Sequence, residues 1–194
     1  MGEEWGMDFS HPVMRTLLHR RDIRCEGYER EDGLWDIEAS LLDTRTSPVP
    51  LPFGSTLTPG EPLHQMGLRI TVDRDAVIHA IEALTAQGPS PECRDIAGTY
   101  RQLLGLRIGT GFTAEVKRLF AGRLGCTHLS DLLGPLATTA MQTLWAAQIR
   151  NATKGVEVPI SIRKPEKLID SCHAFRSDGD IARVHWPDSY TGDA

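Results

Sequence analysis

The chain has 194 residues, 40% of them hydrophobic, and a formal net charge of −5 at pH 7. That length can bury one sizeable core, and the acidic balance gives no electrostatic footprint for nucleic acid. No stretch approaches the roughly 18 apolar residues of a membrane helix, and the acidic N-terminus lacks the layout of a signal peptide. We therefore expect a cytoplasmic protein that binds neither nucleic acid nor a membrane.

Residues 22–44 predict a first β-hairpin. Two stretches with partial apolar and polar alternation flank Asp32-Gly33, a dipeptide suited to a tight hairpin turn. Residues 46–62 are rich in Pro, Thr, Ser and Gly and predict a loop. A second hairpin is expected from strands at 64–73 and 76–85, because apolar residues alternate along the first of them.

The pattern becomes helical at Cys93, after the loop at 86–92. Apolar residues at helical spacing predict helices over 93–106, 112–124 and roughly 127–150. Pro135 falls inside the third helix, which predicts either a kink or two short helices that meet there.

Strands that precede helices, without βαβ alternation, favour an α+β fold. We expect an antiparallel sheet of two hairpins with helices packed on one face. The domain is predicted to span residues 1–155. The polar tail, residues 156–194, is predicted to pack back on this domain, with a short helix near 165–172 and a strand near 181–186.

The four cysteines are the first candidates for chemistry. In a reducing cytosol such thiols are buried, catalytic or metal-bound rather than paired in disulfides. Cys93 and Cys126 each open a predicted helix, and a helix N-terminus favours the thiolate. The thiolate is the species that binds a metal ion or attacks an electrophile. Cys25 lies inside a predicted strand and is assigned to core packing.

Histidines accompany these thiols at the starts of elements. His64 opens a strand, His128 lies two residues after Cys126, and Cys172-His173 lies in the tail. Zinc takes about four nitrogen, sulfur or oxygen ligands. The sequence thus predicts a zinc or iron site with ligands drawn from one set: His64, Cys93, Cys126, His128, Cys172 and His173. The alternative is that the cysteines are small buried residues of the core.

Other signals favour structural explanations. The glycines of GLRIGTGF, residues 105–112, follow a helix rather than a strand, which indicates a helix end and a turn instead of a dinucleotide site. Asp36 and Glu38 share a strand face and are expected to be solvated. His19 and His79 are predicted to lie at the surface.

Several long segments resemble one bacterial family described only as a domain of unknown function, number 2889. The resemblance covers about residues 15–190 and implies no activity. The segments that carry it are HRRDIRCEGYEREDGLWDIEASLLDT, GEPLHQMGLRITVD, LLGLRIGTGF, GCTHLSDLLGPLATTAMQ and DSCHAF.

A more distant resemblance is to the iron–sulfur scaffold proteins of the IscU/NifU type. MGLRITVD (66–73) is similar to a strand of that family, Cys93 to its second cysteine and Cys126 to its third. The resemblance implies a SufE/NifU-like fold and an iron–sulfur cluster in a shared pocket. Pro62 stands at the first cysteine position and His64 near an aspartate position. One zinc or iron ion therefore suits this set at least as well as a [2Fe–2S] cluster.

Three functions follow from these patterns, and the first is favoured. It is a metal-binding protein that acts as a scaffold, an accessory protein or a metal-dependent enzyme. The second is an enzyme that attacks a small-molecule substrate with Cys126, using His128 or His64 as the base. The third is a non-catalytic accessory subunit whose apolar helix, residues 129–145, binds a protein partner.

Overall fold

The computed structural model describes residues 9–10, 13–153 and 168–192. The chain divides into two compact units, Met1–Met141 and Gln142–Ala194. The first unit contains a four-stranded antiparallel sheet and helices, which confirms the predicted α+β class. Within the described ranges, no helix is long and apolar enough to cross a membrane.

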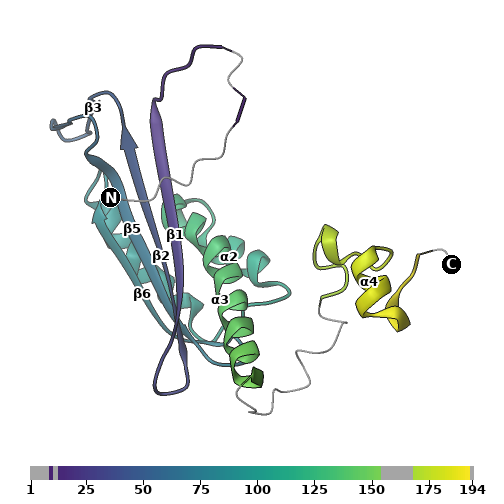
Figure 1. Cartoon of the computed structure of the whole chain (residues 1–194). Coiled ribbons are helices and arrows are strands. Elements are labelled where there is room, and N and C mark those ends of the chain that lie inside the picture. Colours follow the sequence, from purple (N-terminus) through teal and green to yellow (C-terminus); the bar gives the residue numbers. More distant parts are fainter. Residues whose placement is uncertain (1–8, 11–12, 154–167, 193–194) are drawn as a thin grey trace. The chain divides into compact units, whose positions relative to one another are not determined.

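The sheet consists of the two predicted hairpins placed side by side (Figure 1). Its strand order is β1-β2-β5-β6, and every neighbouring pair is antiparallel. The first hairpin turns through Gly33, whose φ of 83° is one that glycine adopts without strain. The predicted loop at 46–62 holds a two-stranded sheet of its own, β3 with β4. The strands are β1 (His19–Glu29), β2 (Trp35–Arg45), β3 (Val49–Pro50), β4 (Thr56–Leu57), β5 (Pro62–Val72) and β6 (Ile78–Gln87).

One face of this sheet is buried and the other is exposed. Alternate residues of β2 and β5 are buried, as the two-residue period of a strand requires. The apolar stripe of the long helix α3 (Thr127–Thr153), which runs alongside the sheet in Figure 1, is buried as well. The core of the first unit therefore lies between sheet and helix. Its members include Ile37, Ala39, Leu41, Met66, Leu68, Ile70, Leu129, Leu132, Leu133, Leu136 and Ala140.

The helices differ from expectation in two places. The predicted helix over 93–106 is one α-helical turn followed by a 3₁₀ helix, because Gly98 and Thr99 are weak α-helix formers. The third helix runs through Pro135 as one element, so of the two predicted alternatives, a kink or two short helices, the second is wrong. The elements are α1 (Glu92–Asp95), η1 (Ile96–Leu103), α2 (Phe112–Phe120), η2 (Gly122–Leu124) and α3 (Thr127–Thr153).

In the second unit, the predicted strand near 181–186 is wrong. This segment is the short helix α4 (Asp180–His185), where Asp180 in the first turn and Arg183 in the last form an ion pair of 2.9 Å. Both charges are favourable to the helix dipole. The predicted helix near 165–172 is not helical at 168–172, and its first residues lie outside the described part. The described residues of this unit also include two short 3₁₀ helices, η5 (His173–Phe175) and η6 (Pro187–Ser189).

Candidate metal site

A row of polar side chains continues the buried face of the sheet at one end. Asp43 of β2 lies opposite Arg21 of β1 and opposite His64 of β5 in the strand register. Asp43 follows the same two-residue period as the buried residues Leu41 and Ala39, so its carboxylate also points to the buried side. Its side chain is only 1% exposed. A buried carboxylate of this kind requires partners.

Arg21 is the principal partner of Asp43. Its Nε donates to Oδ1 and its Nη2 to Oδ2, both at 2.8 Å, in a bidentate pair. The same guanidinium donates through Nη1 to Asp131 of α3 at 2.9 Å. Nε2 of His19 lies 3.4 Å from Oδ1. Arg21 therefore holds the carboxylate in place and ties the sheet to the first turns of α3.

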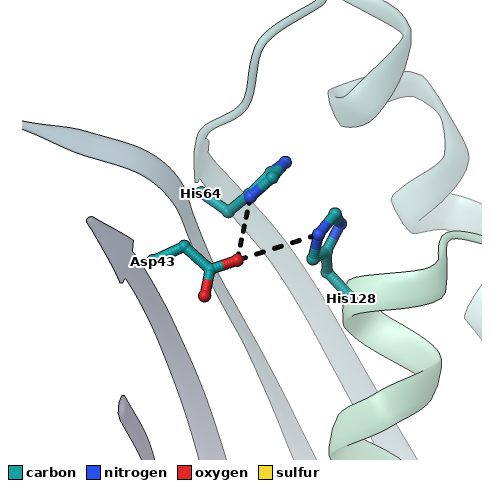
Figure 2. Close-up of side chains that lie close together, drawn as sticks. All are labelled: Asp43, His64 and His128. Carbon is teal, nitrogen blue, oxygen red and sulfur yellow. Dashed lines mark hydrogen bonds and ion pairs between the residues drawn. The ribbon is translucent and has the colours of Figure 1, made fainter. Parts of the chain in front are cut away.

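Two imidazoles approach the other side of the carboxylate. Nδ1 of His64 lies 2.9 Å from Oδ2 of Asp43, and Nε2 of His128 lies 3.8 Å from the same oxygen. Figure 2 shows both rings turned toward this one carboxylate. The rings also stack on each other, with centroids 3.6 Å apart and an interplanar angle of 29°. Three elements thus converge on Oδ2.

Tyr100 fixes the beginning of α3, which carries His128. Its side chain is fully buried, and its hydroxyl oxygen accepts a hydrogen bond from the Cys126 backbone N–H at 3.1 Å. The same hydroxyl lies 2.8 Å from the Cys126 carbonyl and 2.8 Å from Oγ of Ser130. The Tyr100 ring stacks on Phe120 at 4.4 Å. These contacts keep the first turn of α3 from fraying, so the backbone of His128 is held in place.

Hydrogen bonds in this cluster keep the carboxylate ionised, and burial keeps the imidazoles neutral. Burial alone would raise the pKa of Asp43, but hydrogen bonds from Arg21 and His64 outweigh it and lower the pKa to about 2. Burial lowers the pKa of His64, against the opposing effect of Asp43. Burial, followed by the neighbouring His64 and Arg21, lowers the pKa of His128. At neutral pH both rings therefore have a nitrogen lone pair available.

Asp43, His64 and His128 form a set that can hold a metal ion. Each offers one ligand atom, and these atoms all lie within 4.8 Å of one another. The side chains of His64 and His128 are 12% and 23% exposed, so the imidazoles are accessible from solvent. Two imidazoles and one carboxylate are ligands that zinc and non-haem iron accept.

The structure brings together only part of the predicted ligand set. His64 and His128 belong to the group, and Cys126 lies beside it, with Sγ 3.9 Å from Nδ1 of His128. Cys93 is outside the group and lies next to Gly88 after the end of β6, where a Cβ on the glycine would approach its side chain to 2.7 Å.

Cys172 and His173 belong to the second unit, where Cys172 is exposed and His173 opens η5. Their part in a metal site stays a prediction.

Comparison with known proteins identifies the family. A family model described as "Protein of unknown function (DUF2889)" matches residues 19–142, more than half of the chain. The chain belongs to this family. No curated protein and no solved structure matches it significantly. The predicted SufE/NifU-like fold and the relation to iron–sulfur scaffolds therefore stay predictions. Asp43, His64 and His128 all lie in the matched region.

Sequence reasoning missed Asp43 and Arg21. The signal was present in the pattern: Asp43 continues the run of alternate residues through Ile37, Ala39 and Leu41, where an apolar side chain is expected. A carboxylate at such a position needs a partner. The hairpin that turns at Gly33 places Arg21 opposite it. His19, expected at the surface, is half-buried beside the same carboxylate.

Proposed function

We propose that this protein binds one divalent transition-metal ion, zinc or iron, through Asp43, His64 and His128. The observation that carries the proposal is the convergence of three ligand atoms from β2, β5 and α3 within 4.8 Å of one another. No two of these residues are neighbours in sequence, so local geometry alone does not account for their meeting.

One ionised carboxylate and two neutral imidazoles face the position proposed for the ion. The pKa of Asp43 is lowered to about 2, and the lowered pKa values of His64 and His128 keep both rings neutral at neutral pH. One anionic and two neutral donors are ligands that a divalent transition-metal ion accepts, although Arg21 and Arg45 also act on the same group. In the absence of metal, His64 donates its Nδ1 proton to Asp43. Metal binding at that nitrogen requires only that the proton move to Nε2, with no change in ring charge.

Three protein ligands leave coordination positions for water or for a small-molecule substrate. A site with three protein ligands and an open position is the arrangement of catalytic rather than structural zinc. The ion would polarise a bound carbonyl or lower the pKa of a bound water, and the pair of Arg21 with Asp43 would keep the carboxylate oriented. A metal-dependent enzyme is therefore favoured over a purely structural metal protein.

Cobalt(II) substitution tests the metal site. The chain, stripped with a chelator and titrated with Co²⁺, should bind about one equivalent per chain and show visible d–d absorption bands. His64→Ala and His128→Ala should each weaken binding by about 100-fold or more, since each removes a ligand. His79→Ala is the matched control, because His79 also pairs with an aspartate, Asp73, at 2.7 Å on the same sheet.

Cys126→Ser separates this site from the sulfur ligand set predicted from the sequence. It should retain the cobalt stoichiometry, because Cys126 is outside the group of close ligand atoms. Equal retention of cobalt by wild type and by the His64→Ala/His128→Ala double variant would refute the proposal. Loss of cobalt in Cys126→Ser alone would instead favour a sulfur-containing site.

A second function has one specific observation in its favour. Sγ of Cys126 lies 3.9 Å from Nδ1 of His128 and 3.9 Å from Sδ of Met66, so a histidine base stands beside a thiol at the start of α3. If Cys126 is a nucleophile, iodoacetamide should label it rapidly, and His128→Ala should slow that labelling about 10-fold or more. Labelling at the same rate in both proteins would exclude this function.

The accessory-subunit hypothesis rests on the apolar helix over residues 129–145, which is buried on one side and exposed on the other. Leu129, Leu132 and Leu136 are fully buried within the chain, whereas Met141 and Trp145 are 49% and 53% exposed. The predicted partners, a protein or a small-molecule substrate, remain proposals, and the open coordination positions favour the small molecule.

A further inference from the structure

The two edges of the sheet are finished in different ways. At the β6 edge, the Ile78 N–H donates to the Leu106 carbonyl at 2.9 Å, and the Gly105 N–H donates to the Ile78 carbonyl at 2.8 Å. Helix η1 packs beside this strand. The β1 edge has no such cover: among the described residues, no strand pairs with its outer side. It is the open edge of the sheet.

Strand β1 lacks most of the features that protect open edges. It is 11 residues long, contains no proline, and pairs with β2 without a bulge. Short edge strands, prolines and bulges are the usual devices against pairing with another chain. Ile23, at the middle of β1, is 40% exposed.

The charges on β1 alternate in sign along one face. Arg20, Asp22, Arg24 and Glu26 occupy successive positions on the exposed face of the sheet; the first three are exposed and Glu26 is partly exposed. Nη2 of Arg24 donates to Glu26 within the strand at 2.7 Å. Charged side chains of any sign are enough to protect an edge strand from pairing. Here the signs alternate, so two copies of this strand that run antiparallel can place each charge opposite one of the other sign.

We propose that two copies of this chain dimerise by antiparallel pairing of their β1 strands, with Ile23 of one copy opposite Ile23 of the other. A two-fold axis perpendicular to the sheet keeps the exposed faces on the same side. In this register, residues 19–27 of each copy overlap. Arg20 lies opposite Glu26 of the second copy, and Asp22 lies opposite its Arg24. Every charged position on the exposed face then meets the opposite charge.

Neighbouring registers lose this complementarity. A shift of the centre to Asp22 places two aspartates opposite each other, and a shift to Arg24 places two arginines opposite each other. Opposite charges directly across an antiparallel pair each contribute roughly 0.2–1 kcal/mol, and like charges are destabilising. The main-chain hydrogen bonds of the open edge would provide the affinity, and the charges would select the register.

Charge-reversed variants of the full chain test this dimer. Wild type should sediment as a dimer of the 21.4 kDa chain at micromolar concentration. Asp22→Arg/Glu26→Arg makes the β1 face entirely basic, and Arg20→Glu/Arg24→Glu makes it entirely acidic. Each variant alone should dimerise at least about 10-fold more weakly, because like charges oppose each other. An equimolar mixture of the two should recover a dimer.

Recovery on mixing distinguishes this interface from damage to the fold, which mixing cannot repair. Glu82→Arg, on the opposite edge strand β6, is the control and should dimerise as wild type does. A wild type that stays monomeric at about 200 µM would overturn the proposal, because even a dimer with a dissociation constant in the micromolar range is populated at that concentration. A dimer that persists unchanged in both charge variants would also overturn it.

A cysteine placed at the two-fold axis tests the register. Under oxidising conditions, Ile23→Cys should form a disulfide that joins position 23 of one copy to position 23 of the other, identified by peptide mapping, because the two residues face each other. Arg20→Cys should not, since a strand rises about 3.3 Å per residue and the two copies of position 20 would lie roughly 20 Å apart. Cross-linking at position 20 in preference to position 23 would exclude this register.

Discussion

The sheet carries two histidine–aspartate pairs that look alike in hydrogen-bond distance and differ in surroundings. Nδ1 of His64 lies 2.9 Å from Asp43, and Nε2 of His79 lies 2.7 Å from Asp73. The first pair is 12% and 1% exposed, whereas the second is 48% and 29% exposed. A short contact between these residue types therefore does not by itself identify a site.

The two aspartates have different hydrogen-bond partners. Asp73 accepts hydrogen bonds from the backbone N–H groups of Asp75 and Val77, at 2.9 and 3.0 Å, and so stabilises the turn between β5 and β6. Asp43 accepts from side chains of other strands and has a second imidazole, His128, within reach. Several side chains from different elements converge on the buried carboxylate of Asp43, which makes it part of the candidate site, whereas Asp73 mainly accepts local backbone hydrogen bonds of a turn.

The largest expected effect on stability is at Asp43. Asp43→Ala should lower the free energy of unfolding of the metal-free protein by about 3 kcal/mol, because it leaves Arg21 without its bidentate partner in a half-buried position. Asp73→Ala should cost about 1 kcal/mol, since it removes turn hydrogen bonds near solvent. Urea denaturation measures both. Equal losses would remove the distinction between the two pairs.

The pH dependence of stability in acid should also reflect the pairing of Asp43. The pKa of Asp43 is about 2 in the folded chain and near 3.8 ordinarily, so its stabilising effect is complete above about pH 4 and is lost as the pH falls through 2. That difference corresponds to about 2 kcal/mol. Asp43→Asn should abolish this part of the acid dependence, measured as the free energy of unfolding against pH. An unchanged profile in Asp43→Asn would show that the carboxylate is not held in this way.

Tyr100 should show a smaller effect with a functional component. Tyr100→Phe removes the hydroxyl that accepts from the Cys126 N–H, and should cost about 1–2 kcal/mol of stability. Because His128 follows directly on the released turn, Co²⁺ affinity should also fall, by about 10-fold. Ser130→Ala removes only one partner of the hydroxyl and serves as the milder control. Lost stability with full cobalt affinity would limit Tyr100 to a structural role.

The smallest effect is expected at the exposed pair. His79→Ala should change the free energy of unfolding by less than about 1 kcal/mol, because ion pairs near solvent contribute little. It should leave cobalt binding unchanged. A large change in either quantity would show that the Asp73–His79 pair has a role beyond the turn.

The sequence predicted the sheet better than it predicted the site. Alternation and the Asp32-Gly33 turn identified both hairpins, because these signals are local. The segment of η1 was predicted as helical but not as a 3₁₀ helix, and α4 was predicted as a strand, because short segments have little periodicity to distinguish these structures.

Of the site, His64 and His128 were identified from their places at the starts of elements. Asp43 was missed because its importance depends on the pairing of β2 with β5, a contact between separate hairpins. Cys93 was predicted to be a metal ligand because its thiol lies at the start of a helix, but its sulfur is not part of the group of close ligand atoms. The position of a residue at the start of a helix or strand can be read from the sequence. Whether two such residues lie close together depends on long-range strand pairing and helix packing, which the sequence pattern does not show.

Anomalous diffraction from crystals soaked in zinc tests the central claim most directly. We expect one peak at about 2.0–2.2 Å from Oδ2 of Asp43 and from the facing imidazole nitrogens of His64 and His128. No peak is expected between Asp73 and His79. Zinc bound only at Asp73 and His79, or only at the cysteines, would contradict the account.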